Sequence, residues 1–238
     1  MLTEQIETVA HDIKNAMGDN LVALYNYGSA LTEYYCDFSD LDFLVILKEA
    51  TPEDLAALKG IVSQHATEGT SIDINVQTED EMPSRRNKAF WHNNRAAYMQ
   101  REISLYGQLL HGDDQFASHL DIDQKELTLE CVRVLNSLVY QTRKALINRE
   151  LTAKEKYTIL KFCIYGSMYA LAAKGIFPQS SDQIFVQFKA EYGDVGDPEV
   201  FSKLKTTGGN VDESYIIEAY RFLKRLDEAV HDVYLKEL

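Results

Sequence analysis

Three acidic residues in the first part of the chain are spaced for metal chemistry. Asp40 and Asp42 lie at the head of a continuous apolar run, residues 43–47, which is typical of a buried strand. Side chains two positions apart in a strand share a face, so these two carboxylates lie side by side. Adjacent carboxylates repel each other unless a cation lies between them. The pair therefore predicts a divalent cation, and Mg²⁺ carrying a nucleoside triphosphate fits best, because proteins hold Mg²⁺ through one or two carboxylates and substrate phosphates.

A third carboxylate and a glycine–serine pair extend this pattern. Residues 71–76 alternate between polar and apolar, which predicts a short strand with Asp73 and Asn75 on one face. Asp73 can therefore meet the other two carboxylates at one edge of a sheet. Gly28 and Ser29 follow another apolar segment. Glycine has no Cβ to keep a phosphate away, and the serine amide and hydroxyl can donate to phosphate oxygens.

The joint spacing of these residues resembles the signature of the nucleotidyltransferase superfamily. That signature is an apolar residue, Gly-Ser, a spacer, and then Asp-apolar-Asp-apolar. Here it stands as YGS at 27–29, ten spacer residues at 30–39, and DLDF at 40–43. The resemblance covers about residues 20–77 and is greatest to the minimal and antibiotic nucleotidyltransferases.

The resemblance implies a role for each residue of the pattern. Asp40, Asp42 and Asp73 would be the catalytic carboxylates and would hold one or two Mg²⁺ ions. Gly28 and Ser29 would bind the nucleotide. An acceptor hydroxyl would then attack the α-phosphorus in line, with pyrophosphate leaving. The resemblance favours AMP transfer from ATP, although base recognition depends on pocket shape and the sequence leaves it open.

The acceptor is expected in a cleft between two domains, since ligand sites favour domain interfaces. A general base for its hydroxyl is expected from a carboxylate of the second domain. Glu130, Glu150 and Glu155 are the candidates, and the sequence does not choose among them.

Hydrophobic periodicity predicts an α/β (α+β) fold, a small mixed sheet followed by an all-α helical bundle. The resemblance implies that the sheet is of the nucleotidyltransferase type. The predicted domains are residues 1–115 and 116–238. The first should contain a helix that ends at Gly18, with Ile6, Val9, Ile13, Ala16 and Met17 on its apolar side. Strands are then predicted at 21–27, 41–47 and 71–76, and a helix is predicted from the Thr51 cap to about 66. Residues 84–110 are predicted to be helical, with the helix ending near Gly107 and a turn at 111–114.

The second domain shows helical stripes and helix caps throughout. One stripe runs through Leu127, Cys131, Val134, Leu135, Leu138 and Thr142, and the last helix has Tyr215, Ile216, Ala219, Phe222, Leu223, Leu226 and Val230 on its apolar side. Helices are predicted to begin at the Thr152 capping box, at Ser180 or Ser181, at Asp197-Pro198 and after Asp212.

Residues 161–188 resemble the HEPN-type bundle, a helical domain that includes some RNases. Those RNases use an Arg and a His that lie four to six residues apart on the last helix. Arg225 and His231, with five residues between them, fit that interval. HEPN domains that are AMPylated carry His-X-Tyr, whereas this chain has His231-Asp232-Val233-Tyr234. The absence of His-X-Tyr counts against both an RNase role and self-modification by AMP. An Arg and a His on a polar helix face are also most often solvent-exposed.

Composition limits the partners. The 238 residues carry a net charge of −13, which repels a nucleic-acid backbone and suits a small, cationic acceptor. Residues 82–101 contain no acid and carry Arg85, Arg86, Lys88, Arg95 and Arg101, either as a solvated helix face or as contacts for a polyphosphate. Three scattered cysteines, no export signal and no membrane-length apolar run predict a cytoplasmic protein. The apolar stripes are also compatible with a homodimer.

These observations predict a Mg²⁺-dependent enzyme that transfers a nucleoside monophosphate to a hydroxyl of a small molecule such as an antibiotic. Two other classes remain open. One is a toxin–antitoxin-like protein AMPylator fused to a HEPN domain. The other is a non-catalytic nucleotide sensor on the same scaffold, which has no physical reason to keep crowded carboxylates.

Overall fold

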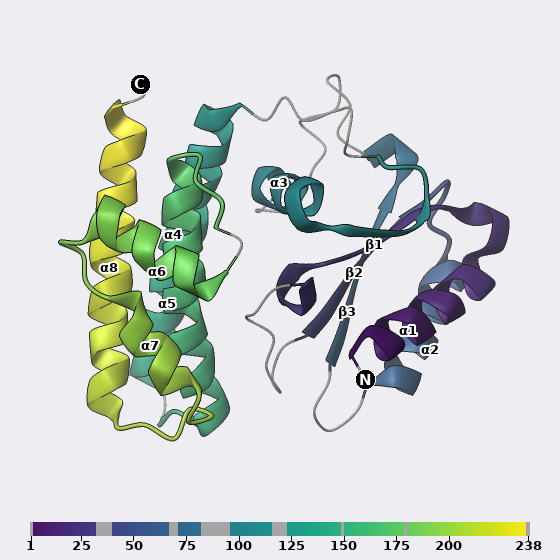
Figure 1. The fold of residues 1–238 in the computed structure, drawn as a ribbon. Helices are drawn as coiled ribbons and strands as arrows, with labels where there is room; N and C mark the ends of the chain where they lie inside the picture. Colours follow the sequence, from purple (N-terminus) through teal and green to yellow (C-terminus); the bar gives the residue numbers. More distant parts are fainter. Residues whose placement is uncertain are drawn as a thin grey trace. The chain divides into compact units, whose positions relative to one another are not determined.

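The computed structural model describes residues 2–31, 40–66, 71–81, 96–115, 123–148, 150–178 and 180–236 (Figure 1). The chain divides into two compact units. The first comprises Met1–Asn93 and Met99–Asp121, and the second comprises Asn94–Tyr98 and Ile122–Leu238.

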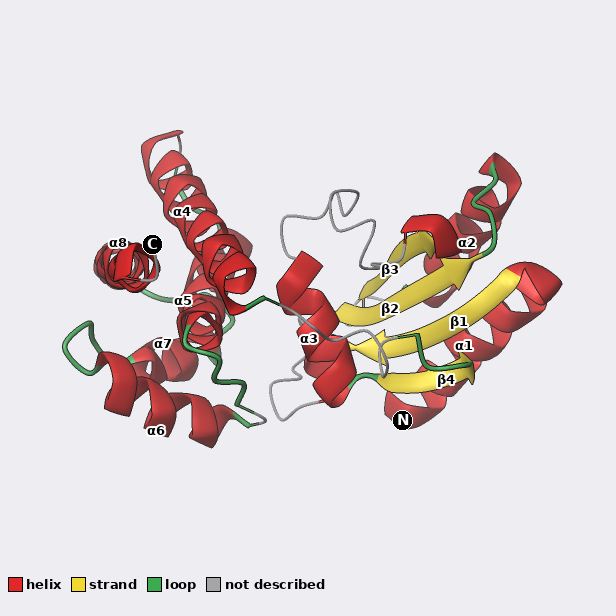
Figure 2. Ribbon diagram, turned by 90° about the horizontal axis from the view of Figure 1, so that it is seen from above, coloured by secondary structure: helices red, strands yellow, loops and turns green. Residues whose placement is uncertain are grey.

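The first unit contains a four-stranded mixed sheet (Figure 2). Its strands are β1 (Leu21–Tyr27), β2 (Asp40–Leu47), β3 (Ser71–Thr78) and β4 (Gln108–Gly112), in the order β3-β2-β1-β4. β2 and β3 are parallel, while β1 is antiparallel to both β2 and β4. Short 3₁₀ turns at Gly18–Asn20, Gly28–Leu31 and Glu79–Glu81 follow the helix α1 (Leu2–Met17), β1 and β3, respectively.

Helices cover both faces of the sheet, which explains why β2 is apolar at nearly every position. Leu41, Phe43, Val45 and Leu47 pack in one core with α1 (Leu2–Met17) and α2 (Pro52–His65). Leu44 and Ile46 face the other way and pack against Met99 and Ile103 of α3 (Ala96–Tyr106). α1 and α2 are also joined by a hydrogen bond between His65 Nε2 and Asp12 Oδ2, which lie 2.7 Å apart.

Most predicted elements of this unit are confirmed, and one strand was missed. Strands 21–27, 41–47 and 71–76 and the helix beginning after Thr51 are present, and Thr51 forms a capping box with Asp54. The helix predicted over 84–110, with its end near Gly107, stops at Tyr106, and residues 108–112 form β4, the strand that was missed. Residues 82–95 lie outside the described residues. Ala16, predicted on the apolar side of α1, is exposed.

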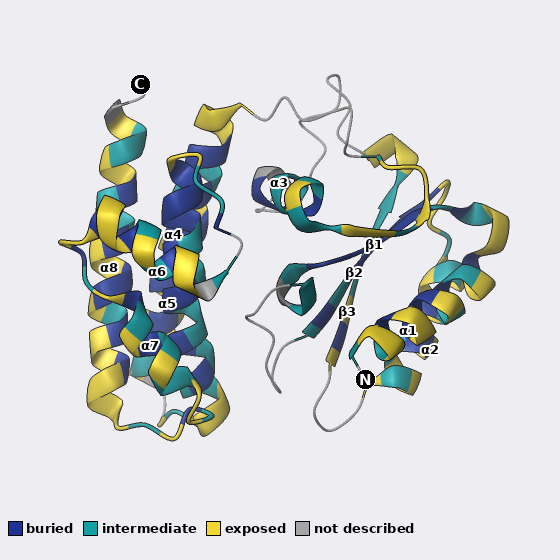
Figure 3. Cartoon of the chain, in the orientation of Figure 1, coloured by how far each residue is buried: buried dark blue, intermediate teal, exposed yellow. Residues whose placement is uncertain are grey.

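The second unit is helical, as predicted. Its helices are α4 (Gln124–Asn148), α5 (Ala153–Ala173), α6 (Ser181–Tyr192), α7 (Pro198–Lys205) and α8 (Glu213–Lys236). α4, α5 and α8 pack against one another, and buried residues concentrate where these long helices meet (Figure 3). The predicted α4 stripe is buried throughout, and so is that of α8 except for Tyr215, which is exposed and lies outside the core.

A glycine allows the three long helices to approach closely. A Cβ built on Gly166 of α5 would lie 3.1–3.2 Å from Cδ2 atoms of Leu223, Leu135 and Leu226. These leucines come from α8 and α4, so a larger residue at position 166 would push both neighbouring helices away.

We expect Gly166→Val to lower the free energy of unfolding by about 1–3 kcal/mol, because the added methyl groups overpack this contact. Gly60 of α2 is the matched control, since a Cβ there meets no atom within 4 Å. Gly60→Ala should raise stability by roughly 0.5–1 kcal/mol through helix propensity alone. Chemical denaturation followed by circular dichroism measures both. Equal stability of Gly166→Val and the parent protein would contradict the packing argument.

Candidate active site

The strand register brings two of the predicted carboxylates side by side. In the parallel pair of β2 and β3, Asp42 is the direct partner of Asp73, and Asp40 is the partner of Ser71. Leu41 and Ile72 point into the core under α1 and α2, so the side chains of all three acids lie on the opposite face. Asp73 is exposed, and Asp40 and Asp42 are half-buried.

The glycine of the sequence motif lies directly against one of these carboxylates. Gly28 follows β1 with φ +77°, and Tyr27 before it is the register partner of Asp42. A Cβ at position 28 would clash with Asp42 Oδ2 and lie 3.1 Å from its Cγ. The position therefore requires glycine for its backbone angle and for the space that the carboxylate occupies. Gly28 itself is partly exposed. The Ser29 side chain lies outside the described side chains.

Neighbouring polar groups hold the strand ends around the carboxylates. The Ser71 hydroxyl donates to Asp40 Oδ1. Asn75 Nδ2 donates to the Tyr27 hydroxyl over 2.8 Å, which links β3 to β1 across β2. Sequence reasoning placed Asn75 on the face of Asp73 but gave it no role. It also missed Ser71 and Tyr27, whose contacts depend on strand register.

Carboxylate oxygens are the kind of ligand that a hard divalent cation such as Mg²⁺ prefers. Asp42 and Asp73 supply oxygen ligands from adjacent strands, and Mg²⁺ takes its remaining ligands from water and substrate phosphates. Within the described residues, no group of three or more His, Cys, Asp or Glu side chains is arranged to hold a metal ion. Asp40, which accepts from Ser71, lies two register positions from the pair. The three-carboxylate metal site therefore stays a prediction.

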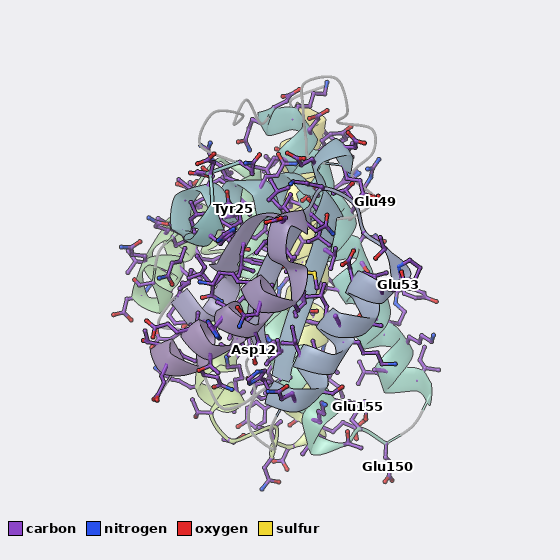
Figure 4. The ribbon with its side chains drawn as sticks, turned by 90° about the vertical axis from the view of Figure 1, so that its right-hand side faces the viewer. Asp12, Tyr25, Glu49, Glu53, Glu150 and Glu155 are labelled. Carbon is purple, nitrogen blue, oxygen red and sulfur yellow. The ribbon has the colours of Figure 1, made fainter. Side chains whose placement is uncertain are left out.

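The candidate general bases all lie in the second unit and differ in their surroundings. Glu155 accepts from the Thr152 N–H and hydroxyl over 2.9 and 2.8 Å and so caps α5. Glu150 is exposed before that helix (Figure 4). Glu130 is half-buried and accepts from the Tyr98 N–H over 2.9 Å in the first turn of α3. The choice among them stays open, although Glu155 has a clear structural role.

The Arg and His suggested by the HEPN resemblance lie on α8. Arg225 Nε donates to the Val195 carbonyl over 2.9 Å, which fixes the segment after α6. Asp227 lies between Arg225 and His231 in the sequence. Burial raises the pKa of Asp227, while His231 and a hydrogen bond from Asn136 partly lower it. The HEPN-type reading of this unit stays a prediction.

Of the basic residues between 82 and 101, only Arg101 falls within the described residues. Arg101 lies on α3. Burial and the charge of Glu102 raise the pKa of Tyr106 above its usual value, and the charge of Arg101 partly opposes this rise. Arg85, Arg86, Lys88 and Arg95 lie outside the described residues, so the proposed polyphosphate contact stays a prediction. No helix among the described residues has the length and apolar character needed to cross a membrane.

Comparisons with known proteins identify the fold. No protein-family model matches the sequence, and no curated protein matches it. Among solved structures, the chain is similar to spectinomycin adenyltransferase AAD(9) from Enterococcus faecialis, crystallised with ATP and spectinomycin. The TM-score is 0.69 at 14% identity, over 96% of this chain and 99% of that chain. The likeness includes the sheet and the helical unit, and the chain therefore has the fold of a nucleotidyltransferase.

Proposed function

We propose that the chain is a Mg²⁺-dependent nucleotidyltransferase that transfers AMP from ATP to a hydroxyl of a small molecule. The observation that carries this proposal is the register of Asp42 with Asp73 beside Gly28, on a fold shared with an adenyltransferase. Adjacent like charges destabilise a sheet, so a metal-binding role gives a physical reason for keeping them.

Each residue of the pair would contribute through its position. Asp42 and Asp73 would hold Mg²⁺ from two neighbouring strands, with Asp40 as the third candidate ligand. When bound, Mg²⁺ would neutralise charge on the phosphate oxygens of the nucleotide. Gly28 leaves room for the Asp42 carboxylate, which lies where a side chain at position 28 would be. Ser29 remains the predicted donor to the nucleotide phosphate.

A small acceptor fits the charge of the protein. The net charge of −13 disfavours nucleic acid and favours a cationic molecule near the exposed Asp73. The similar adenyltransferase was crystallised with a nucleotide and a small molecule, ATP and spectinomycin. The likeness to that protein extends through the helical unit, which supports a role in nucleotidyl transfer for the whole chain. We do not propose an RNase function.

A pyrophosphate-release screen tests the proposal directly. Purified protein, Mg²⁺, each of four nucleoside triphosphates and a panel of hydroxylated cationic small molecules are combined. We expect release with ATP and one class of acceptor, together with a mass increase of the acceptor by one AMP. Binding of Mg²⁺–ATP without release would instead indicate a nucleotide sensor. Labelling of a protein by α-labelled ATP would indicate an AMPylator.

We expect Asp42→Asn to lower kcat by roughly a hundredfold or more, because losing a metal ligand removes a few kcal/mol of transition-state stabilisation. The fold should remain intact, since removing one of two adjacent like charges relieves repulsion. Glu53→Gln is the charge-matched control, because Glu53 is exposed on α2 (Figure 4). Turnover by Asp42→Asn comparable to that of the parent would refute the assignment of Asp42.

Two glycines separate backbone strain from displacement of the carboxylate. Gly28 and Gly18 both have positive φ, but a Cβ at Gly18 meets no atom within 4 Å. Alanine at either position should cost about 1–2 kcal/mol of stability for the left-handed backbone. Only Gly28→Ala should also weaken Mg²⁺–ATP binding, because its Cβ displaces Asp42. Calorimetric titration and thermal unfolding measure the two effects, and equal binding by both variants would argue against the contact.

A further inference from the structure

We infer that Asn26 is a positioning residue that fixes Asp42 for metal–nucleotide binding. This inference rests on the proposed function. Asn26 would not touch the nucleotide or the ion, because it lies within β1 and has no exposed surface. It would act through the main chain of Asp42.

Asn26 is an unusual residue for its location. It has the strand parity of Leu24, which lies in the apolar core under α1 and α2. Among the residues that the structure describes, the other fully buried polar ones are Thr128, Thr142 and Ser167, and each hydroxyl donates to a carbonyl four residues earlier in its own helix. The Thr128 hydroxyl also lies 3.0 Å from the Ala173 carbonyl of α5. The Asn26 side chain instead forms a hydrogen bond from β1 to β2. A buried amide in an apolar core is costly, so its retention calls for an explanation.

The hydrogen bond of Asn26 reaches the predicted metal ligand. Its Nδ2 donates to the Asp42 carbonyl over 3.0 Å. The side-chain Oδ1 is buried and has no hydrogen-bond partner within the described residues. Turning the amide over would place Oδ1 against the Asp42 carbonyl, so the bond sets the orientation of the amide even though it leaves Oδ1 unsatisfied.

Asn26 near the end of β1 and Gly28 directly after that strand both contact Asp42. Asn26 binds the carbonyl of Asp42, while Gly28, two residues later, lies against its carboxylate. Tyr27 between them is its register partner. Metal ligands need their orientation fixed by surrounding groups, and loss of such groups weakens metal binding even when the ligand remains.

A purely structural role would predict a different outcome. If Asn26 only joined β1 to β2, removing its amide would change stability and leave ion binding at the carboxylates unchanged. Affinity for Mn²⁺ with a non-hydrolysable ATP analogue therefore separates the two roles. Hydrogen exchange of the Asp42 and Phe43 amides without ligand shows whether loss of the bond loosens the main chain at Asp42.

The test compares Asn26→Leu with Thr142→Val, which removes a buried hydrogen bond in α4 at nearly constant shape. We expect Asn26→Leu to weaken Mn²⁺–nucleotide binding by about 10- to 100-fold, in the range seen for groups that orient metal ligands. Its Asp42 and Phe43 amides should also exchange faster. Thr142→Val should leave both readouts at parent values. Equal affinity of Asn26→Leu and the parent, or equal losses in both variants, would overturn the inference.

A measurement on the unmodified protein covers the case in which Asn26→Leu does not fold. On titration with Mg²⁺ and the ATP analogue, the Asn26 side-chain amide resonances should shift with the same affinity as global binding. The Gln124 amide, which donates to the Ala172 and Ala173 carbonyls, should not shift. An unmoved Asn26 amide in a protein that binds the analogue would overturn this inference alone. Absence of binding by the parent would overturn the proposed function with it.

Discussion

The parallel pairing of β2 with β3 is the interaction on which the candidate site depends. Its register makes partners of Asp42 and Asp73, and the same register pairs Phe43 with Ile74 and Val45 with Val76. A like-charged cross-strand pair costs about 0.2–1 kcal/mol, whereas each fully buried large apolar side chain contributes roughly 1.5–3 kcal/mol. Since β2 is completely buried from Phe43 to Leu47, the apolar pairs set the register and the acidic pair follows from it.

The buried apolar residues and the acidic residues lie at different positions along the strands of the sheet. α1 and α2 cover one face, and α3 covers the other at Leu44 and Ile46 through Met99 and Ile103. The carboxylates come earlier on the strands, at positions 40, 42 and 73, where Asp73 is exposed. The apolar segment thus anchors β2 and β3, and their N-terminal ends are free to carry charged groups that could not be buried in the core.

Sequence reasoning succeeded where the information is local. The apolar run after Asp42 predicts β2, the alternation around Asp73 predicts β3, and the Thr51 and Thr152 capping boxes predict two helix starts. β4 was missed because it is a short edge strand with little burial, so neither alternation nor a continuous apolar run marks it.

The contacts of Asn26 and Asn75 were missed for a different reason. Each depends on a residue of another strand, and an unaligned sequence carries no register. The sequence of β1 reads as an apolar strand in which Asn26 is simply a polar exception. The same limit applies to Asp42 and Asp73: their types and strand positions indicate a shared edge, but only the pairing shows that they are direct partners.

The fold alone would suit an enzyme or a nucleotide sensor, because function depends on sites rather than on folds. The candidate site differs from the rest of the fold because it contains groups whose placement costs stability. Adjacent like charges at Asp42 and Asp73, a positive-φ glycine that touches a carboxylate, and the unsatisfied Oδ1 of Asn26 all meet around Asp42. The other two buried unsatisfied side-chain oxygens within the described residues belong to Gln77 and Gln187, which are only half-buried. Adjacent like charges and a buried amide that converge on one residue are typical of sites kept for function, since each of these two features could be relieved by a single substitution. Asp42 is therefore the residue on which the proposed metal–nucleotide site most depends.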